Sequence, residues 1–308
     1  MNKTINIRIN SLVLAVVLSL ATSSVTFAKQ TSVQENTKEK EKVEETKQNQ
    51  TAEKRKQILS EATKAISRTR EALKMLDEKK AKEALELLEK ATGKLEIILA
   101  RDPGLALAPA GVTSATYDVF TDIASINVIR DRAEDALEDG RLQEARRLIR
   151  NLASETVISI TNIPLATYPS AIKLAAGSID EGDLETAKTI LQTALNTLVI
   201  TESIIPLPVV HAEYKLKEAQ VLAGKVERNE EENTRLKNFI ADARNELKLA
   251  EALGYSSKTN FKHLYEQLDH IEEKTKEGKT DKNFFAKIKS FLKDITATSQ
   301  SEKISGQK

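Results

Sequence analysis

Three related copies of one segment recur along the chain, and this repetition limits the possible folds more than any other feature of the sequence. The copies come into register when Ala72, Ala133 and Ala175 are aligned. Each copy continues through an acidic pair, a turn position and a second apolar stretch, and then ends at a proline. The turn positions are Lys79, Gly140 and Gly182, and the closing prolines are Pro103, Pro164 and Pro206. Self-similarity of this kind predicts a helical-repeat fold.

The second stretch of each copy has the apolar spacing of a helix that buries one face. In the first copy, Ala84, Leu87, Leu88 and Ala91 are three and four residues apart. This pattern predicts return helices over residues 81–100, 142–162 and 184–205, and a long helix over residues 113–139. We therefore predict an all-α fold, in which antiparallel helical hairpins from three related repeats pack into a helical bundle with a C-terminal helical extension.

The ends of the chain differ in composition from its middle. Residues 1–28 resemble a secretory signal peptide, with a basic start (Lys3 and Arg8), an apolar stretch and a small-residue cleavage site ending at Ala28. Residues 29–53 are rich in Gln, Lys and Glu and predict a disordered polar linker. The helical domain then covers residues 54–296, and residues 297–308 form a disordered tail. The signal peptide predicts a periplasmic location.

Overall charge and cysteine content exclude some classes of function. The chain has 47 basic and 46 acidic residues, so no strong positive field attracts nucleic acid, and we expect no nucleic-acid partner. Cysteine is absent, which excludes disulfides, thiol nucleophiles and cysteine-ligated metals. Only 4% of the residues are aromatic, so the core must be aliphatic.

Beyond the third copy, the sequence predicts further helices and contains a possible capping residue. Ser257 is placed to cap a helix that continues to about Lys276, because its hydroxyl can accept from a free amide of the first turn. A last amphipathic helix follows over residues 280–295. Its apolar face matches an ordinary core stripe, which favours docking onto the protein's own bundle over binding to a membrane.

Four short segments of the chain resemble a known family. They are 168–173 (YPSAIK), 194–199 (ALNTLV), 205–208 (IPLP) and 249–255 (LAEALGY). In sequence and order they are similar to the YfdX family of bacterial exported proteins, over most of residues 54–295. The resemblance implies an all-helical periplasmic protein associated with stress or acid response. It implies no catalytic residues.

All six prolines lie in three equivalent positions between the hairpins, and apolar residues surround them. If the hairpins pack side by side in one direction, these loops share one end of the molecule. The loops would then form an apolar surface, and exposed apolar patches commonly bind ligands or partners. The candidate binding residues there are Leu105, Leu107, Tyr168, Leu207 and Val209.

Two carboxylates, Glu155 and Glu202, stand in apolar stretches close to these prolines. A carboxylate among aliphatic residues must point outward, find a partner, or have a raised pKa. The candidate partners are His211, Tyr214, Asp118, Asp122, Lys173 and Tyr168. Two interpretations stay open, namely simple pairing or exposure, and a ligand-binding or proton-sensing role.

Signals for catalysis and metal binding are weak. His263, Glu266 and His270 share one side of a helix at a spacing that a divalent metal can use, yet the buried stripe lies beside them, which favours a solvated flank. The sequence has no His-Glu-x-x-His motif, no nucleophile elbow and no phosphate loop. We expect no metal, no cofactor and no enzymatic activity, although an enzyme stays a third hypothesis.

These observations predict a periplasmic, stress-associated binding protein of chaperone-like character. It would accept hydrophobic small molecules or unfolded client proteins at the apolar proline loops. The alternative is a structural or adaptor module, whose helical repeats bind one specific protein partner. We expect no association with membranes, and an apolar surface makes a homo-oligomer a further expectation.

Overall fold

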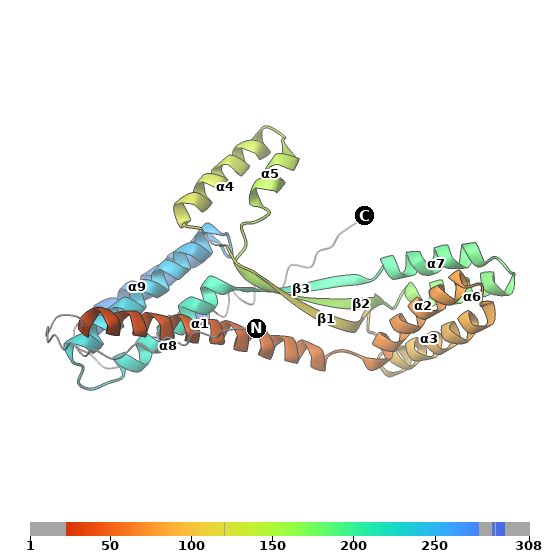
Figure 1. The fold of residues 1–308 in the computed structure, drawn as a ribbon, viewed down its shortest axis with the longest axis horizontal. Helices are drawn as coiled ribbons and strands as arrows, with labels where there is room; N and C mark the ends of the chain where they lie inside the picture. Colours follow the sequence, from red (N-terminus) through yellow and green to blue (C-terminus); the bar gives the residue numbers. More distant parts are fainter. Residues whose placement is uncertain (1–22, 120, 277–284, 287, 293–308) are drawn as a thin grey trace, which may run out of the picture. The chain divides into compact units, whose positions relative to one another are not determined.

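The structure is a computed structural model that describes residues 23–119, 121–276, 285–286 and 288–292. The chain divides into two compact units, Met1–Lys40 and Glu41–Lys308. Within the second unit, helices dominate, and three strands form one small antiparallel sheet (Figure 1). Among the described helices, none combines the length and apolar character needed to cross a membrane.

The described helices and strands follow one another in this order: α1 (Ser23–Lys56), α2 (Ser60–Asp77), α3 (Ala81–Arg101), β1 (Leu107–Tyr117), α4 (Ile123–Glu138), α5 (Leu142–Ile149), β2 (Glu155–Pro164), α6 (Tyr168–Asp180), α7 (Leu184–Asn196), β3 (Val199–Pro206), α8 (Leu207–Ala223), α9 (Glu230–Ala252) and α10 (Lys258–Lys276).

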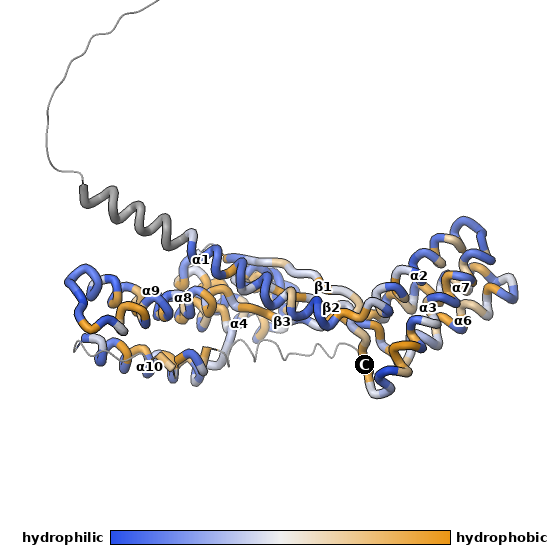
Figure 2. The backbone as a smooth tube through the Cα atoms, turned by 90° about the horizontal axis from the view of Figure 1, so that it is seen from below, coloured by the Kyte–Doolittle hydropathy of each residue, from blue (hydrophilic) through white to orange (hydrophobic). Residues whose placement is uncertain are grey.

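Helix α1 covers the segment that the sequence predicts as a disordered linker. Gln, Glu and Lys are good helix formers, and oppositely charged side chains one turn apart support the helix. Lys42 pairs with Glu45 at 3.2 Å, and Lys47 pairs with Glu44 at 3.5 Å. The described part of α1 is largely hydrophilic, as the composition requires (Figure 2). The predicted signal peptide falls mainly on residues 1–22, outside the described residues.

Three helical hairpins form where the sequence repeats, namely α2–α3, α4–α5 and α6–α7. Each hairpin turns at the predicted position, and the turning residue has a positive φ: 57° at Lys79, 73° at Gly140 and 81° at Gly182. Glycine adopts this conformation without a steric penalty, whereas Lys79 adopts it at some cost. The predicted hairpin turns are confirmed, while the relationship among the three hairpins as structural repeats stays a prediction.

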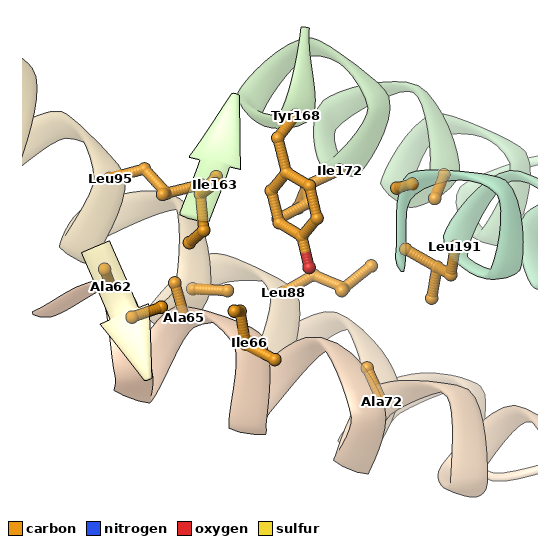
Figure 3. Packing of buried hydrophobic residues seen from close by; sticks show 14 of the residues in the cluster. Ala62, Ala65, Ile66, Ala72, Leu88, Leu95, Ile163, Tyr168, Ile172 and Leu191 are labelled. Carbon is orange, nitrogen blue, oxygen red and sulfur yellow. The ribbon is translucent and has the colours of Figure 1, made fainter. Parts of the chain in front are cut away.

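Helices α2, α3, α6 and α7 share one aliphatic core. Ala72, Ala84, Ala175 and Ala187 are all fully buried, so the helices approach closely along these alanines. Figure 3 shows Tyr168 inserted between the two hairpins, close to Ile66, Leu88 and Ile172. The hairpin α4–α5 belongs to a separate small cluster, which contains Ala133, Ala136 and Ala145. The expected single bundle of three hairpins is therefore wrong.

The purely helical prediction is also wrong, because strands replace the expected ends of two return helices and the start of the long helix. Helix α5 ends at Ile149 instead of Asn162, α7 ends at Asn196 instead of Ile205, and β1 occupies residues expected to be loop and helix. Residues 155–164 explain the difference, since they are rich in β-branched residues, which favour strands, and their burial alternates along most of the strand.

The sheet has the strand order β1-β2-β3, and both pairings are antiparallel. In the first pairing, Tyr117 lies opposite Glu155, and in the second, Glu155 lies opposite Pro206. The prolines occupy positions that a sheet tolerates. Pro164 and Pro206 end their strands, and Pro109 precedes a shift in register on the outer strand β1. Three of the six prolines therefore lie in strands, while Pro169 and Pro208 lie in the first turns of α6 and α8, so the expected set of proline loops at one end is wrong.

One face of the sheet is packed, and helix α8 contributes to its cover. Ile158 and Ile205 from neighbouring strands form a cluster with Val210 of α8, and Val43 packs against it. Asn162 is buried within the sheet, where its amide nitrogen donates to the carbonyls of Ile160 and Val199. On the opposite face of β2, the side chains of Glu155, Val157 and Ser159 are only partly buried.

Helices α8, α9 and α10 form a second aliphatic core, to which Phe261 of α10 contributes a fully buried ring. The predicted capping residue is confirmed, because Ser257 Oγ accepts a hydrogen bond of 3.2 Å from the backbone N–H of Asn260. Of the predicted last helix, the described residues Phe285, Ile288 and Leu292 are buried in this core. This placement agrees with docking onto the protein itself. The predicted tail, residues 297–308, lies outside the described residues.

Candidate functional site: the half-open face of the sheet

The two faces of the central strand β2 differ in burial. Side chains alternate between the faces of a strand, so Glu155, Val157 and Ser159 share one face, while Thr156 and Ile158 share the other. The second set is buried, whereas every member of the first set is partly exposed. We call the first face the half-open face of the sheet.

Strand pairing brings the two predicted carboxylates onto this half-open face. Glu202 of β3 lies directly opposite Ser159, whose hydroxyl donates a hydrogen bond of 3.2 Å to Glu202 Oε1. Residues opposite each other in an antiparallel pair point to the same face, and Ser159 shares its face with Glu155. The sequence placed both carboxylates near prolines, but only the sheet brings them together.

Glu155 has an electrostatic environment that favours its neutral form. Burial raises the pKa of the Glu155 carboxyl above its ordinary value, and the negative charge of Glu202 raises it further. A hydrogen bond from the Tyr255 hydroxyl opposes these effects without cancelling them. Half-burial beside a second carboxylate therefore makes Glu155 bind a proton more readily than an ordinary, solvated glutamate.

Tyr255 and Ser154 are residues of this site that sequence reasoning did not select. The backbone N–H of Ser154 donates to the Tyr255 hydroxyl at 2.8 Å, and Ser154 Oγ donates to Asp118 Oδ1 at 2.6 Å. Burial, followed by the charge of Glu155, raises the pKa of the Tyr255 hydroxyl, so Tyr255 stays a hydrogen-bond donor. Tyr255 follows the turn at Gly254, and the LAEALGY segment was the only signal that pointed to it.

Apolar residues frame the carboxylates on the same face. Ile200 and Ile204 alternate with Glu202 along β3, and Tyr117 lies opposite Glu155 on β1. Ile200 is 55% exposed and Tyr117 is 54% exposed, which is high for side chains of this size. The face therefore combines apolar contact area with carboxylate and hydroxyl groups that can accept and donate hydrogen bonds.

The other predicted site residues do not form an exposed surface. Tyr168 is fully buried in the four-helix core, and Leu207 and Val209 are buried at the start of α8. Leu105 and Leu107 are partly buried, and Leu105 packs against that four-helix core. The described residues thus do not form the expected exposed apolar loops, because the side chains that were expected to be exposed there are buried or partly buried inside the protein.

His211 and Tyr214 lie on α8, the helix whose Val210 covers the packed face of the sheet. His211 Nδ1 lies 3.4 Å from Glu246 Oε2 of α9, which is an ion-pair distance whenever the imidazole is protonated. Tyr214 is buried. The structure therefore pairs His211 with a different carboxylate from the two that the sequence suggested.

The histidines of α10 show no arrangement that would bind a metal. His263 Nδ1 lies 3.3 Å from Glu266 Oε2, and the His263 ring stacks on Phe291 with 6.1 Å between the ring centroids. In the part of the chain that the structure describes, no group of three or more potential metal ligands is close enough together to hold an ion.

The Glu155→Gln substitution tests the electrostatics of this face. A raised folded-state pKa means that the stability contributed by protonated Glu155 is complete below about pH 4.5, the ordinary carboxyl value, and is lost as the pH rises through the raised pKa. Glutamine resembles the protonated acid, so the variant should be more stable than the original protein at neutral pH, by up to about 1 kcal/mol.

Urea denaturation at a series of pH values measures this effect. The two proteins should converge below about pH 4.5, and Glu266→Gln, an exposed position on α10, is the matched control. Equal stability of the Glu155→Gln variant and the original protein at every pH would show that Glu155 is fully solvated in the folded protein.

Comparisons with known proteins give a match to a family model and a similarity to a solved structure. Residues 65–204, from within α2 to within β3, match the family model described as YfdX protein. The chain is also similar to a solved crystal structure of YfdX from Salmonella Typhi, with 14% sequence identity and a TM-score of 0.34. That match covers 49% of this chain and 93% of the other. No curated protein matches the chain.

Proposed function

Because residues 65–204 of the chain are a YfdX domain and this family match does not define an activity, we propose a binding role that rests on the exposed residues of the sheet. In this proposal the protein is a periplasmic, stress-associated binding protein of chaperone-like character. It holds extended segments of unfolded client proteins against the half-open face of its sheet. The location rests on the signal peptide predicted over residues 1–28.

The observation that carries the proposal is the exposed apolar surface of strand β3 at the edge of the sheet. Among the described residues, β3 pairs only with β2, so its outer edge offers backbone groups to an added strand. An extended polypeptide can pair with the free N–H and C=O groups of such an edge through main-chain hydrogen bonds. Ile200 and Ile204 then supply apolar contact, which does not depend on the sequence of the client.

The carboxylates give the proposed site a response to acid. Glu202 and ionised Glu155 accept hydrogen bonds from backbone N–H groups or from basic side chains of a client. Protonation of Glu155 removes one negative charge from a partly buried position, which makes the face more apolar. The proposal therefore expects stronger binding of apolar segments at weakly acidic pH, in agreement with the acid response that the family resemblance implies.

Suppression of client aggregation tests the proposal directly. Reduced insulin is allowed to aggregate with an equimolar amount of the full chain, at neutral and at weakly acidic pH, and light scattering is recorded. The double variant Ile200→Asp with Tyr117→Ser should lose most of the suppression, at least fivefold by initial rate. The control double variant Val226→Asp with Val221→Ser removes exposed apolar residues elsewhere and should keep it.

Two results would contradict the proposal. One is a chain that never suppresses aggregation at either pH, and the other is an equal loss in both double variants. Recovery of one dominant partner by crosslinking in cells would instead favour the adaptor alternative. We propose a binding role without catalysis, with neither a metal nor nucleic acid as a partner and without membrane association.

A further inference from the structure

The strands of the sheet carry carboxylates and no basic side chain. Within β1, β2 and β3, the charged residues are Glu155 and Glu202, and none of the three strands contains lysine, arginine or histidine. Both carboxylates lie on the half-open face. Glu202 accepts a hydrogen bond from Ser159 Oγ, and neither glutamate has an ion-pair partner among the described side chains. The half-open face therefore carries negative charge that no described basic residue balances.

The surroundings of Glu202 strengthen its interaction with any cation that approaches it. Glu202 is only partly exposed, and Ile200 and Ile204 precede and follow it on the same face of β3. A carboxylate in aliphatic surroundings gains more from a charged partner than a carboxylate in open solvent does, because less water surrounds it. A cation against Glu202 is thus held more strongly than on an ordinary protein surface.

Strand β3 also offers backbone groups at its outer edge. Among the described strands it pairs only with β2, so alternate residues of β3 point their N–H and C=O groups away from the sheet. The other edge strand, β1, shifts its register between Pro109 and Gly111, and residues 113–116 have small or polar side chains. Bulges of this kind discourage the addition of a strand, so β3 is the better edge for a partner.

Register decides which side chains an added strand presents to β3. Successive residues of a strand face alternate sides of the sheet, so every second residue of the added strand lies beside Ile200, Glu202 or Ile204. The intervening residues lie beside Thr201 and Ser203 on the packed face. On the half-open face the order is isoleucine, glutamate, isoleucine, which is the same in both directions. One pattern in the client therefore fits a parallel and an antiparallel added strand.

We propose that the sheet selects extended segments in which a lysine or arginine has an aliphatic residue two positions before it and another two positions after it. This inference rests on the proposed function and specifies its client. The basic side chain pairs with Glu202, and the two aliphatic side chains cover Ile200 and Ile204. Apolar contact alone accepts any apolar segment, whereas a carboxylate at the centre favours a cation and repels an anion. Glu202 is therefore the specificity-determining residue.

Short capped peptides measure this preference. The reference peptide is acetyl-Ser-Ile-Thr-Lys-Thr-Ile-Ser-amide with an uncharged fluorescent label, and fluorescence anisotropy reports its binding to the full chain at neutral pH. Glutamate in place of the central lysine should weaken binding about tenfold, since a cross-strand attraction becomes a repulsion. A peptide of equal composition with the central order Thr-Ile-Lys-Ile-Thr directs lysine and isoleucine to opposite faces, so it should also bind about tenfold more weakly.

Reversal of the charge of residue 202 makes the test independent of folding. The Glu202→Lys variant should prefer the glutamate peptide to the lysine peptide, and Glu202→Gln should bind the two alike. A reversed preference is a gain that a misfolded protein does not produce. The matched control, Glu89→Lys on α3, changes the net charge by the same amount at an exposed position and should keep the original preference.

The outcomes separate this inference from the proposed function. If the full chain suppresses insulin aggregation but binds the three peptides with equal affinity, or binds none of them, the inference is overturned and the proposed function stands. An unchanged preference in Glu202→Lys also overturns the inference, and it would leave Glu202 as a charge that only protects the edge from unwanted pairing. A chain that neither suppresses aggregation nor binds any peptide contradicts the proposed function, and this inference with it.

Discussion

Replacing Phe261 by alanine is expected to lower the free energy of unfolding by about 3–5 kcal/mol, the cost of deleting a fully buried aromatic ring. The Phe261 side chain is completely buried between α8, α9 and α10 and lies beside the Tyr265 ring, with 6.5 Å between the ring centroids. Its removal leaves a cavity, because neighbouring helices of a packed core relax only in part.

Chemical denaturation and hydrogen exchange measure this loss together. The aliphatic core around Phe261 is separate from the core of α2, α3, α6 and α7, so amides of α9 and α10 should lose protection first. Tyr117→Ala is the matched control, because it deletes an aromatic side chain that is half exposed, and it should cost about 1 kcal/mol or less. An equally small cost for Phe261→Ala would mean that this core is loosely packed.

Asn162→Ala is expected to destabilise the protein by about 2–3 kcal/mol, because it leaves buried acceptors without their donor. The Asn162 amide nitrogen donates to the carbonyls of Ile160 and Val199 and to the Thr201 hydroxyl, at 3.0–3.1 Å. Two of these partners belong to β3, so the same change should release β3 from β2, with faster exchange of the β3 amides.

The direction of this effect also distinguishes strand from helix. If residues 142–162 formed the helix that their spacing predicts, alanine would replace a poorer helix former and would stabilise the chain by about 0.5 kcal/mol. Asn260→Ala is the control, since the Asn260 side chain is exposed and bonds only to Ser256 Oγ. Stabilisation by Asn162→Ala would contradict the sheet.

The hairpins could be predicted from the sequence because their signals are local. A turn at Gly140 or Gly182 needs only a residue that tolerates positive φ between two amphipathic stretches. Capping by Ser257 is decided within a few residues in the same manner. Neither signal requires a partner from elsewhere in the chain, so both predictions were confirmed.

The half-open face could be predicted only in part. Glu155 and Glu202 stood out as carboxylates among aliphatic residues, and both belong to the face. Their proximity depends on the register that sets Ser159 opposite Glu202, and Tyr255 reaches the site from a segment far along the chain. Periodicity alone could not separate strand from helix in the short apolar segments that carry both glutamates.

The sequence by itself determined the local elements: the helical hairpins, their turns, their caps and the apolar positions that face inward. Tertiary structure decided which hairpins cover each other, that residues 107–117, 155–164 and 199–206 pair as a sheet, and that the apolar proline segments are buried. The physical reason is that backbone pairing and packing between distant segments depend on the free energy of the whole fold, which no local pattern contains. Leu76 and Leu137 show this most plainly, since equivalent residues of related hairpins are buried in one and exposed in the other.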